Sequence, residues 1–209
     1  TVCTLETFML AMVLFPEAQK KAQQELDDVL YGSRLPEFED KDQLLYTVAV
    51  YKEILRWHPL LPTAIAHATT QDDIIDGYFI PRGSIVFGNA WSLLRNEADF
   101  GPDTDQFIPD CFLQPGVRDP ASTGAFGFGR RICPGRDMAE NSLFIAVASI
   151  LQNFDMSGPA DQHGNPLPFE YDWTSGFFSS VINHYKHPTK FKCTIRPRSK
   201  QAGERILAG

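Results

Sequence analysis

A chain of 209 residues with 43% hydrophobic and 22% charged residues has an ordinary globular composition and is long enough for one domain with a sizeable core. This composition excludes collagen-like, coiled-coil and mostly disordered proteins. The formal net charge of -7 excludes a globally basic nucleic-acid-binding chain. The longest apolar stretches, such as 142–151, are far shorter than the about 20 residues that a membrane-spanning helix needs.

Apolar residues recur at helical spacing in four segments, at 1–15, from Pro16 onward, at 42–57 and at 134–154. The first begins without a methionine inside an apolar run, so we expect the chain to be part of a longer protein. Pro16 suits a first helical position, and prolines at 59 and 62 end the third helix. The expected apolar stripes are Ala18, Ala22, Leu26 and Val29, then Leu44, Val48, Tyr51 and Leu55, then Leu143, Ala146, Val147, Ile150, Leu151 and Phe154.

The middle of the chain changes to a strand-like pattern. Asp76-Gly77 lies between two β-rich runs and predicts a hairpin, and 81–83 predicts a second turn. A short helix is expected at 91–96, a long irregular segment at 100–126 and a final strand at 191–195. The fold class is therefore mainly α with small β sheets and no parallel βαβ pattern.

The four cysteines, Cys3, Cys111, Cys133 and Cys193, are scattered and form no C-x-x-C pair. They predict neither a zinc ribbon nor a disulfide scaffold, so reduced cysteines in an intracellular protein are expected. A single cysteine is most often a small buried apolar residue.

Cys133 differs from the others because it lies in a glycine-rich loop directly before a predicted helix. The loop reads Phe126-Gly127-Phe128-Gly129-Arg130-Arg131-Ile132-Cys133-Pro134-Gly135-Arg136. Its glycines allow tight turns and close approach to a flat partner, while the helix N-terminus, its free N–H groups and three arginines favour a thiolate. A thiolate beside an aromatic ring is a soft metal ligand. The alternative is a buried cysteine in a turn.

This loop matches F-x-x-G-x-R-x-C-x-G and strongly resembles the haem-binding signature of cytochrome P450. The resemblance implies a haem cofactor (heme, iron protoporphyrin IX) with Cys133 as the axial thiolate ligand of the metal. It implies that Phe126, Gly129, Arg131 and Gly135 contact the cofactor. His67 matches a position where a basic group meets a haem propionate, and its alternative is a structural histidine.

Glu53 and Arg56 lie three residues apart on the third predicted helix and can pair on one face. Alone they predict a weak surface ion pair. Followed by Trp57-His58-Pro59, they resemble the E-x-x-R motif of the P450 K helix. That resemblance gives them a structural role, which is to hold the irregular segment before the cysteine. The third partner of this motif is an arginine, where this chain has Cys111, so we expect the pair to lack one charged partner.

The resemblance covers nearly all of residues 1–209 as the C-terminal portion of a single cytochrome P450 domain, from the end of the I helix to the C-terminus. The N-terminal part is absent. The family's acid–threonine pair falls at or just before residue 1, so no catalytic residue is assigned. Substrate-pocket positions are implied at Thr63, Ala64, Ile65, Phe177 and Phe178, for which core packing is the alternative.

The implied function is a haem-thiolate monooxygenase that inserts one atom of O2 into a small organic substrate, with electrons from NADPH-cytochrome P450 reductase. The basic residues Arg130, Arg131, Arg136 and Lys52 could face this acidic partner. A narrower resemblance to fungal microsomal P450 hydroxylases is carried by the stretches Gly77-Tyr78-Phe79-Ile80-Pro81-Arg82-Gly83-Ser84 and Phe191-Lys192-Cys193. It implies the cytosolic face of the endoplasmic reticulum membrane for the full-length protein, through the missing N-terminus. The alternatives are a haem-thiolate isomerase or dehydratase, and an inactive haem-binding remnant.

Overall fold

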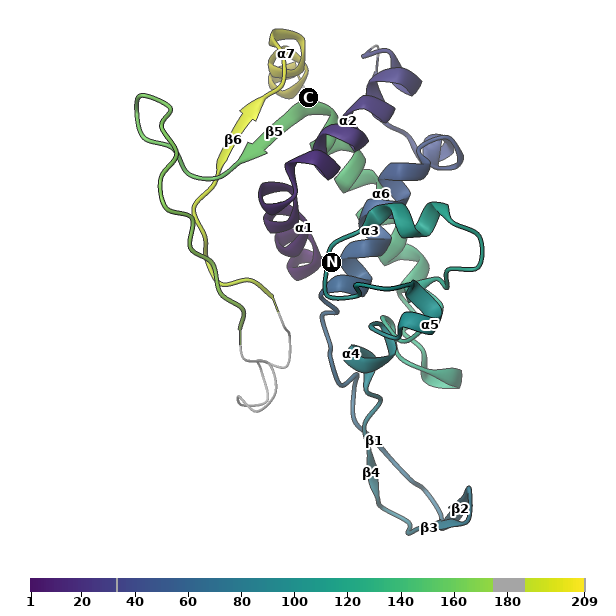
Figure 1. Cartoon of the computed structure of the whole chain (residues 1–209). Coiled ribbons are helices and arrows are strands. Elements are labelled where there is room, and N and C mark those ends of the chain that lie inside the picture. The colour runs from purple at the N-terminus through teal and green to yellow at the C-terminus, as the bar shows by residue number, and fades with distance from the viewer. Residues whose placement is uncertain (33, 175–186, 209) are drawn as a thin grey trace.

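The computed structural model describes residues 1–32, 34–174 and 187–208. Four helices form its centre: α1 (Val2–Leu14), α2 (Pro16–Leu30), α3 (Leu45–Trp57) and α6 (Arg136–Asn153) (Figure 1). Their apolar faces meet in one buried cluster that includes Phe8, Leu26, Tyr51, Phe144 and Leu151. The class expected from the sequence, mainly α with small β sheets, is confirmed.

The first two helices meet at a sharp bend of 104°. Pro16 occupies the start of α2, as predicted, because a first-turn proline removes no helical hydrogen bond. The buried stripe of α2 contains Ala18, Ala22 and Leu26 and continues to Leu30, whereas Val29 is only half-buried. Within the described ranges no single helix combines the length and apolarity needed to cross a bilayer, although α1 and α2 together reach both.

Helix α3 is the most enclosed element and begins three residues later than predicted. The segment 38–42 instead forms a 3₁₀ helix, η1 (Phe38–Asp42). A capping box starts this helix: the Glu37 side chain accepts the Asp40 backbone N–H, and the Asp40 side chain accepts the Glu37 backbone N–H. Of the predicted stripe, Leu44, Tyr51 and Leu55 are buried and Val48 is half-buried. Burial extends around nearly the whole helix, so polar side chains on it must find partners inside the protein.

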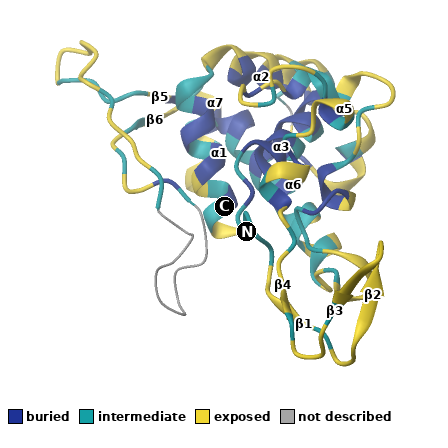
Figure 2. Ribbon diagram, turned by 60° about the horizontal axis from the view of Figure 1, so that its bottom comes forward, coloured by how far each residue is buried: buried dark blue, intermediate teal, exposed yellow. Residues whose placement is uncertain are grey.

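Two small antiparallel sheets project below the helices (Figure 1). Strand β2 (Asp73–Ile75) pairs with β3 (Tyr78–Ile80), and β1 (His67–Ala68) pairs with β4 (Ile85–Val86). The predicted hairpin turn is present, with Asp76 at φ 51° and Gly77 at φ 85°. Figure 2 shows that this region is exposed, in contrast to the buried helices.

The segment between β4 and α6 contains only short helices: α4 (Ala90–Leu93), α5 (Glu97–Phe100) and the 3₁₀ helices η2 (Pro109–Leu113), η3 (Pro120–Ser122) and η4 (Gly129–Arg131). The helix predicted at 91–96 is the shorter α4, and α5 follows it outside that range; an asparagine caps the start of each. The irregular character expected over 100–126 is confirmed. Helix α6 begins at Arg136 rather than at residue 134, because Gly135 takes the cap position.

The C-terminal part forms a third sheet and a last helix. Strand β5 (Phe154–Ser157) pairs with β6 (Thr194–Pro197), so the final strand lies three residues beyond the predicted start. Helix α7 (Lys200–Ala208) was not predicted. It is polar, and Ala202 is its one residue classed as buried among those whose side chains the structure describes.

Candidate functional site

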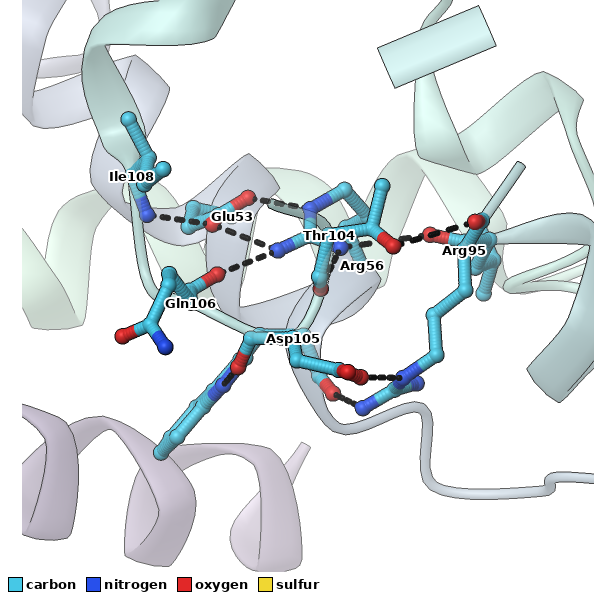
Figure 3. A network of polar contacts seen from close by, with 9 residues as sticks. Glu53, Arg56, Arg95, Thr104, Asp105, Gln106 and Ile108 are labelled. Atoms are coloured by element: carbon cyan, nitrogen blue, oxygen red, sulfur yellow. Dashed lines mark hydrogen bonds and ion pairs between the residues drawn. The ribbon is translucent and has the colours of Figure 1, made fainter. Parts of the chain in front are cut away.

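A buried ion pair on α3 organises the centre of the site (Figure 3). Glu53 is 0% exposed and Arg56 is 2% exposed. The guanidinium donates to both carboxylate oxygens, from Nε to Oε2 at 2.6 Å and from Nη2 to Oε1 at 2.7 Å. Ile108 N–H also donates to Oε1 at 2.6 Å. Burial raises the pKa of the Glu53 carboxyl, and the hydrogen bonds from Arg56 and Ile108 oppose that rise.

All five N–H groups of Arg56 have acceptors. Besides its two bonds to Glu53, it donates to the carbonyls of Leu94 at 3.3 Å, Thr104 at 2.7 Å and Gln106 at 2.8 Å (Figure 3). The pair therefore holds the chain between α4 and η2 against α3. This is the irregular segment that the sequence resemblance assigned to it.

Arg95 adds an outer layer that the sequence did not reveal. Its guanidinium donates to the Trp57 carbonyl at 2.6 Å and to the Asp105 carboxylate at 3.4 Å, and it lies 3.4 Å from the centre of the Trp91 ring. The Trp57 indole N–H donates to the Asp105 carbonyl at 3.0 Å. Burial, then the charge of Arg56, lowers the pKa of Arg95. The segment is thus held at residues 104–106 and at 108.

Cys111 lies on η2, half-buried and reduced. Burial, then the negative charge of Glu53, raises the pKa of its thiol to about 12. The sequence predicts that the Glu53–Arg56 pair lacks the arginine that is the third member of the motif, because this chain has Cys111 at that position. The geometry shows that Ile108 N–H supplies a donor in addition to the two bonds from Arg56. The carboxylate thus accepts three hydrogen bonds without a second arginine.

The cysteine loop closes on itself before α6. Cys133 N–H donates to the Phe126 carbonyl at 2.8 Å, and η4 forms the turn between them. Gly127 (φ 85°) and Gly129 (φ 55°) occupy left-handed backbone conformations that favour glycine. The glycines at these two positions therefore permit the fold of the loop.

The Cys133 side chain is exposed, as a ligand for an external group requires. One expectation was wrong: within the described residues no N–H donates to its sulfur. Of the residues that follow, Pro134 has no N–H, and Arg136 N–H donates to the Cys133 carbonyl at 3.3 Å. The described residues also contain no group of three or more His, Cys, Asp or Glu side chains that could hold a metal ion.

Phe128 packs the cysteine loop against the segment before α4. A Cβ atom at Gly88 would lie 2.0 Å from Cε2 of the Phe128 ring, and one at Gly124 would lie 3.0 Å from the same ring. Gly88 therefore leaves the space that the ring fills. The sequence did not single out this contact, since nothing in the local pattern marks Gly88.

The basic residues predicted for the site differ in their availability. Arg131 and His67 are exposed, and within the described part of the chain neither forms an ion pair or a side-chain hydrogen bond. Arg136 instead pairs with Asp137 at 3.2 Å and Glu140 at 3.8 Å, and Lys52 pairs with Asp119 at 2.7 Å. The exposed Cys133 thiol can ligate iron, and the uncommitted Arg131 and His67 side chains can bind carboxylates, so the chemistry of these three residues fits the haem expected from the sequence.

Comparison with known proteins decides the family. The model of the family Cytochrome P450 matches residues 1–177. The chain belongs to the cytochrome P450 family. The part of the P450 fold that it covers is also shared with solved structures. A zebra fish cytochrome P450 with abiraterone aligns with a TM-score of 0.78 and 28% identity over 95% of this chain and 44% of that chain. A second zebra fish P450 structure, with progesterone, has a TM-score of 0.77 and 28% identity over 93% and 42%.

Fungal P450 monooxygenases are similar along the whole chain. One from Armillaria gallica is 47% identical over 99% of this chain and 39% of the relative. The P450 monooxygenase eriA of Hericium erinaceus is 44% identical over 100% of this chain and 39% of the relative. The chain thus spans 39% of the length of these curated relatives.

The predicted substrate-pocket positions of this P450 chain lie on two segments. Thr63 and Ala64 are half-buried and Ile65 is 68% exposed, in the loop between α3 and β1. Ala64 has φ 52°, a strained value for a residue with a Cβ. Phe177 and Phe178 lie outside the described residues.

Proposed function

We propose that the protein carrying this chain is a haem-thiolate monooxygenase that inserts one atom of O2 into a small organic substrate. The observation that carries the proposal is the exposed Cys133 thiol at the end of the glycine loop, in a chain of the cytochrome P450 family. When bound, haem supplies the oxygen chemistry, and an anionic sulfur donor increases electron density at its iron.

The residues of the chain would divide the binding work. Cys133 would ligate the iron, while Phe126, Gly129 and Gly135 shape the loop around it. Arg131 and His67 would bind the propionates, because both are exposed and make no ion pair within the described residues. Thr63, Ala64 and Ile65 would contact the substrate. This arrangement separates cofactor binding from the buried Glu53–Arg56 pair, which holds the segment and touches no ligand.

We further propose that NADPH-cytochrome P450 reductase supplies the electrons, and that the whole protein lies at the cytosolic face of the endoplasmic reticulum membrane. Of the four basic residues considered for the reductase surface, Arg130 and Arg131 make no ion pair within the described ranges, whereas Arg136 and Lys52 do. Since Arg131 is assigned to a propionate, Arg130 is the better candidate for an acidic partner.

A carbon-monoxide difference spectrum of the reduced full-length protein tests the proposal. The wild type should show the band of a thiolate-ligated haem, Cys133→Ala should lose it, and Cys111→Ala should keep it. The two variants remove the same group from the same chain, so loss in Cys133→Ala alone assigns the ligand. An unchanged band in Cys133→Ala, or no band in the wild type, overturns the proposal.

A further inference from the structure

All three tryptophans of the chain surround one histidine at the end of α3. The His58 ring stacks on Trp173 with ring centres 3.5 Å apart and planes 9° from parallel. The rings of Trp57 and Trp91 meet His58 edge-on, with centres 4.5 Å and 5.6 Å away. Trp173 also meets the Trp57 ring edge-on at 5.9 Å. These contacts join α3, α4 and the C-terminal segment, which are far apart in the sequence.

His58 is the residue from which the loop to β1 leaves α3. The loop is fixed further along by Trp91 N–H, which donates to the Pro62 carbonyl at 2.8 Å, and by Ala64 N–H, which donates to the Leu61 carbonyl at 3.0 Å. Ala64 is also the residue of this loop that has the strained positive φ. A non-glycine residue keeps a positive φ only where its surroundings hold it, and the aromatic cluster supplies such surroundings at the start of the loop.

Trp173 is itself held in place by paired backbone. It forms an antiparallel bridge with Pro188, and Thr189 N–H donates to the Asp172 carbonyl at 2.7 Å. His187 lies 3.2 Å from the Glu6 carboxylate and so connects this segment to α1. Because Trp173 is anchored and stacks on His58, it fixes the residue from which the loop beginning at Pro59 starts.

We propose that His58 and Trp173 are positioning residues for the substrate-facing loop 59–66. The inference rests on the proposed function, which places Thr63, Ala64 and Ile65 at the substrate. Neither ring needs to touch the substrate, because the stack sets where the loop starts and hence where those three side chains lie. An aromatic pair contributes enough to change a local opening or binding equilibrium about two- to twelve-fold.

The test compares Trp173→Ala with Trp173→Phe, which keeps an aromatic ring, and with Tyr171→Ala as a matched control. Tyr171 lies two residues earlier in the same segment, and its ring contacts Phe169. The probes are imidazole and 4-phenylimidazole, titrated spectroscopically into the full-length protein with haem. Both probes would bind the haem iron through a ring nitrogen. Only 4-phenylimidazole also carries a phenyl group that can contact the substrate-facing loop 59–66.

Trp173→Ala should weaken 4-phenylimidazole binding about two- to twelve-fold and leave imidazole binding unchanged, with Trp173→Phe near wild type and Tyr171→Ala unchanged. Equal affinities in all variants, or an equal loss for both probes, overturns the inference. If the wild type lacks the thiolate band, the proposed function fails instead.

Hydrogen exchange then decides the positioning role without haem. The amides of Ala64 and Trp91 should exchange faster in Trp173→Ala and in His58→Leu, and at the wild-type rate in Tyr171→Ala. His58→Leu removes the stack from its other side if Trp173→Ala does not fold. Unchanged exchange at both amides excludes the positioning role.

Discussion

Replacing both members of the buried pair tests whether Arg56 acts mainly on Glu53 or on the backbone. Removing Arg56 alone leaves a carboxylate that is 0% exposed without its cation, which costs about 3–5 kcal/mol. Domains are stable by only about 5–15 kcal/mol, so Arg56→Leu alone removes much of the stability. A buried ion pair replaced on both sides by apolar residues of similar volume is often neutral.

The structure predicts a different result for the double variant Glu53→Leu/Arg56→Met. The carbonyls of Leu94, Thr104 and Gln106 would each lose a donor from Arg56, and Ile108 N–H would lose its acceptor. The loss costs about 1–3 kcal/mol at a buried group such as Leu94, and less at Thr104 and Gln106, which are half-buried and exposed. We therefore expect the double variant to remain about 1–3 kcal/mol below wild type, because the buried Leu94 carbonyl loses this donor. The stability of Arg56→Lys should lie between those of the wild type and of the double variant. An ammonium has three donors, whereas the guanidinium of Arg56 uses five.

Urea unfolding followed by circular dichroism measures these differences, provided that the slope stays constant among the variants. A double variant within about 1 kcal/mol of wild type would refute the reasoning. It would show that the ion pair is replaceable and that the backbone bonds to residues 94, 104 and 106 contribute little.

Three further predictions follow from single side chains. Arg34 donates to both carboxylate oxygens of Asp40 at 2.6 Å and lowers the pKa of that carboxyl. The ionised carboxylate therefore stabilises the fold above its unfolded pKa of 3.8, and this stabilisation is lost as the pH falls through the lower folded pKa. Asp40→Asn should lower the urea midpoint at pH 7, with a difference that shrinks below pH 4, and a constant difference would contradict this. Gly88→Ala should destabilise by about 0.5–1.5 kcal/mol in thermal unfolding, because its Cβ meets the Phe128 ring and must turn that partly exposed side chain out of its rotamer. Adding Phe128→Ala should recover most of that loss, and no recovery would exclude this contact as the cause. In the haem-free protein, iodoacetamide at pH 8 should label the exposed Cys133 before Cys111, whose thiol has a pKa of about 12, and mass spectrometry showing equal rates would refute this.

The long helices could be predicted because their apolar residues repeat over many turns, and their starts were less accurate for local reasons. The capping box of Glu37 and Asp40 draws 38–42 into a separate 3₁₀ helix, so α3 starts at Leu45. Helix α7 escaped prediction since it is short, polar and buried mainly through Ala202.

Some parts of the candidate site could also be predicted from the sequence, and others could not. The cysteine loop could be recognised because its glycines and Cys133 lie within eleven consecutive residues. The pairing of Glu53 with Arg56 follows from their spacing on one helix. The partners of Arg56 could not be predicted, because they are backbone carbonyls of a segment without periodicity, and any residue type supplies a carbonyl.

Helix α3 connects these two parts of the site. Its Arg56 and Glu53 hold the chain at residues 94–108, and its Lys52 pairs with Asp119 at 2.7 Å. Asp119 in turn accepts the Ala121 N–H at 2.8 Å and begins η3, a few residues before Phe126 and the loop that Cys133 closes. The approach to the cysteine is therefore attached at several points to the most enclosed helix of the core. A ligand loop supported in this way can present an exposed thiol in one orientation although its own backbone contains few regular hydrogen bonds, because a rigid element next to it supplies the missing constraint.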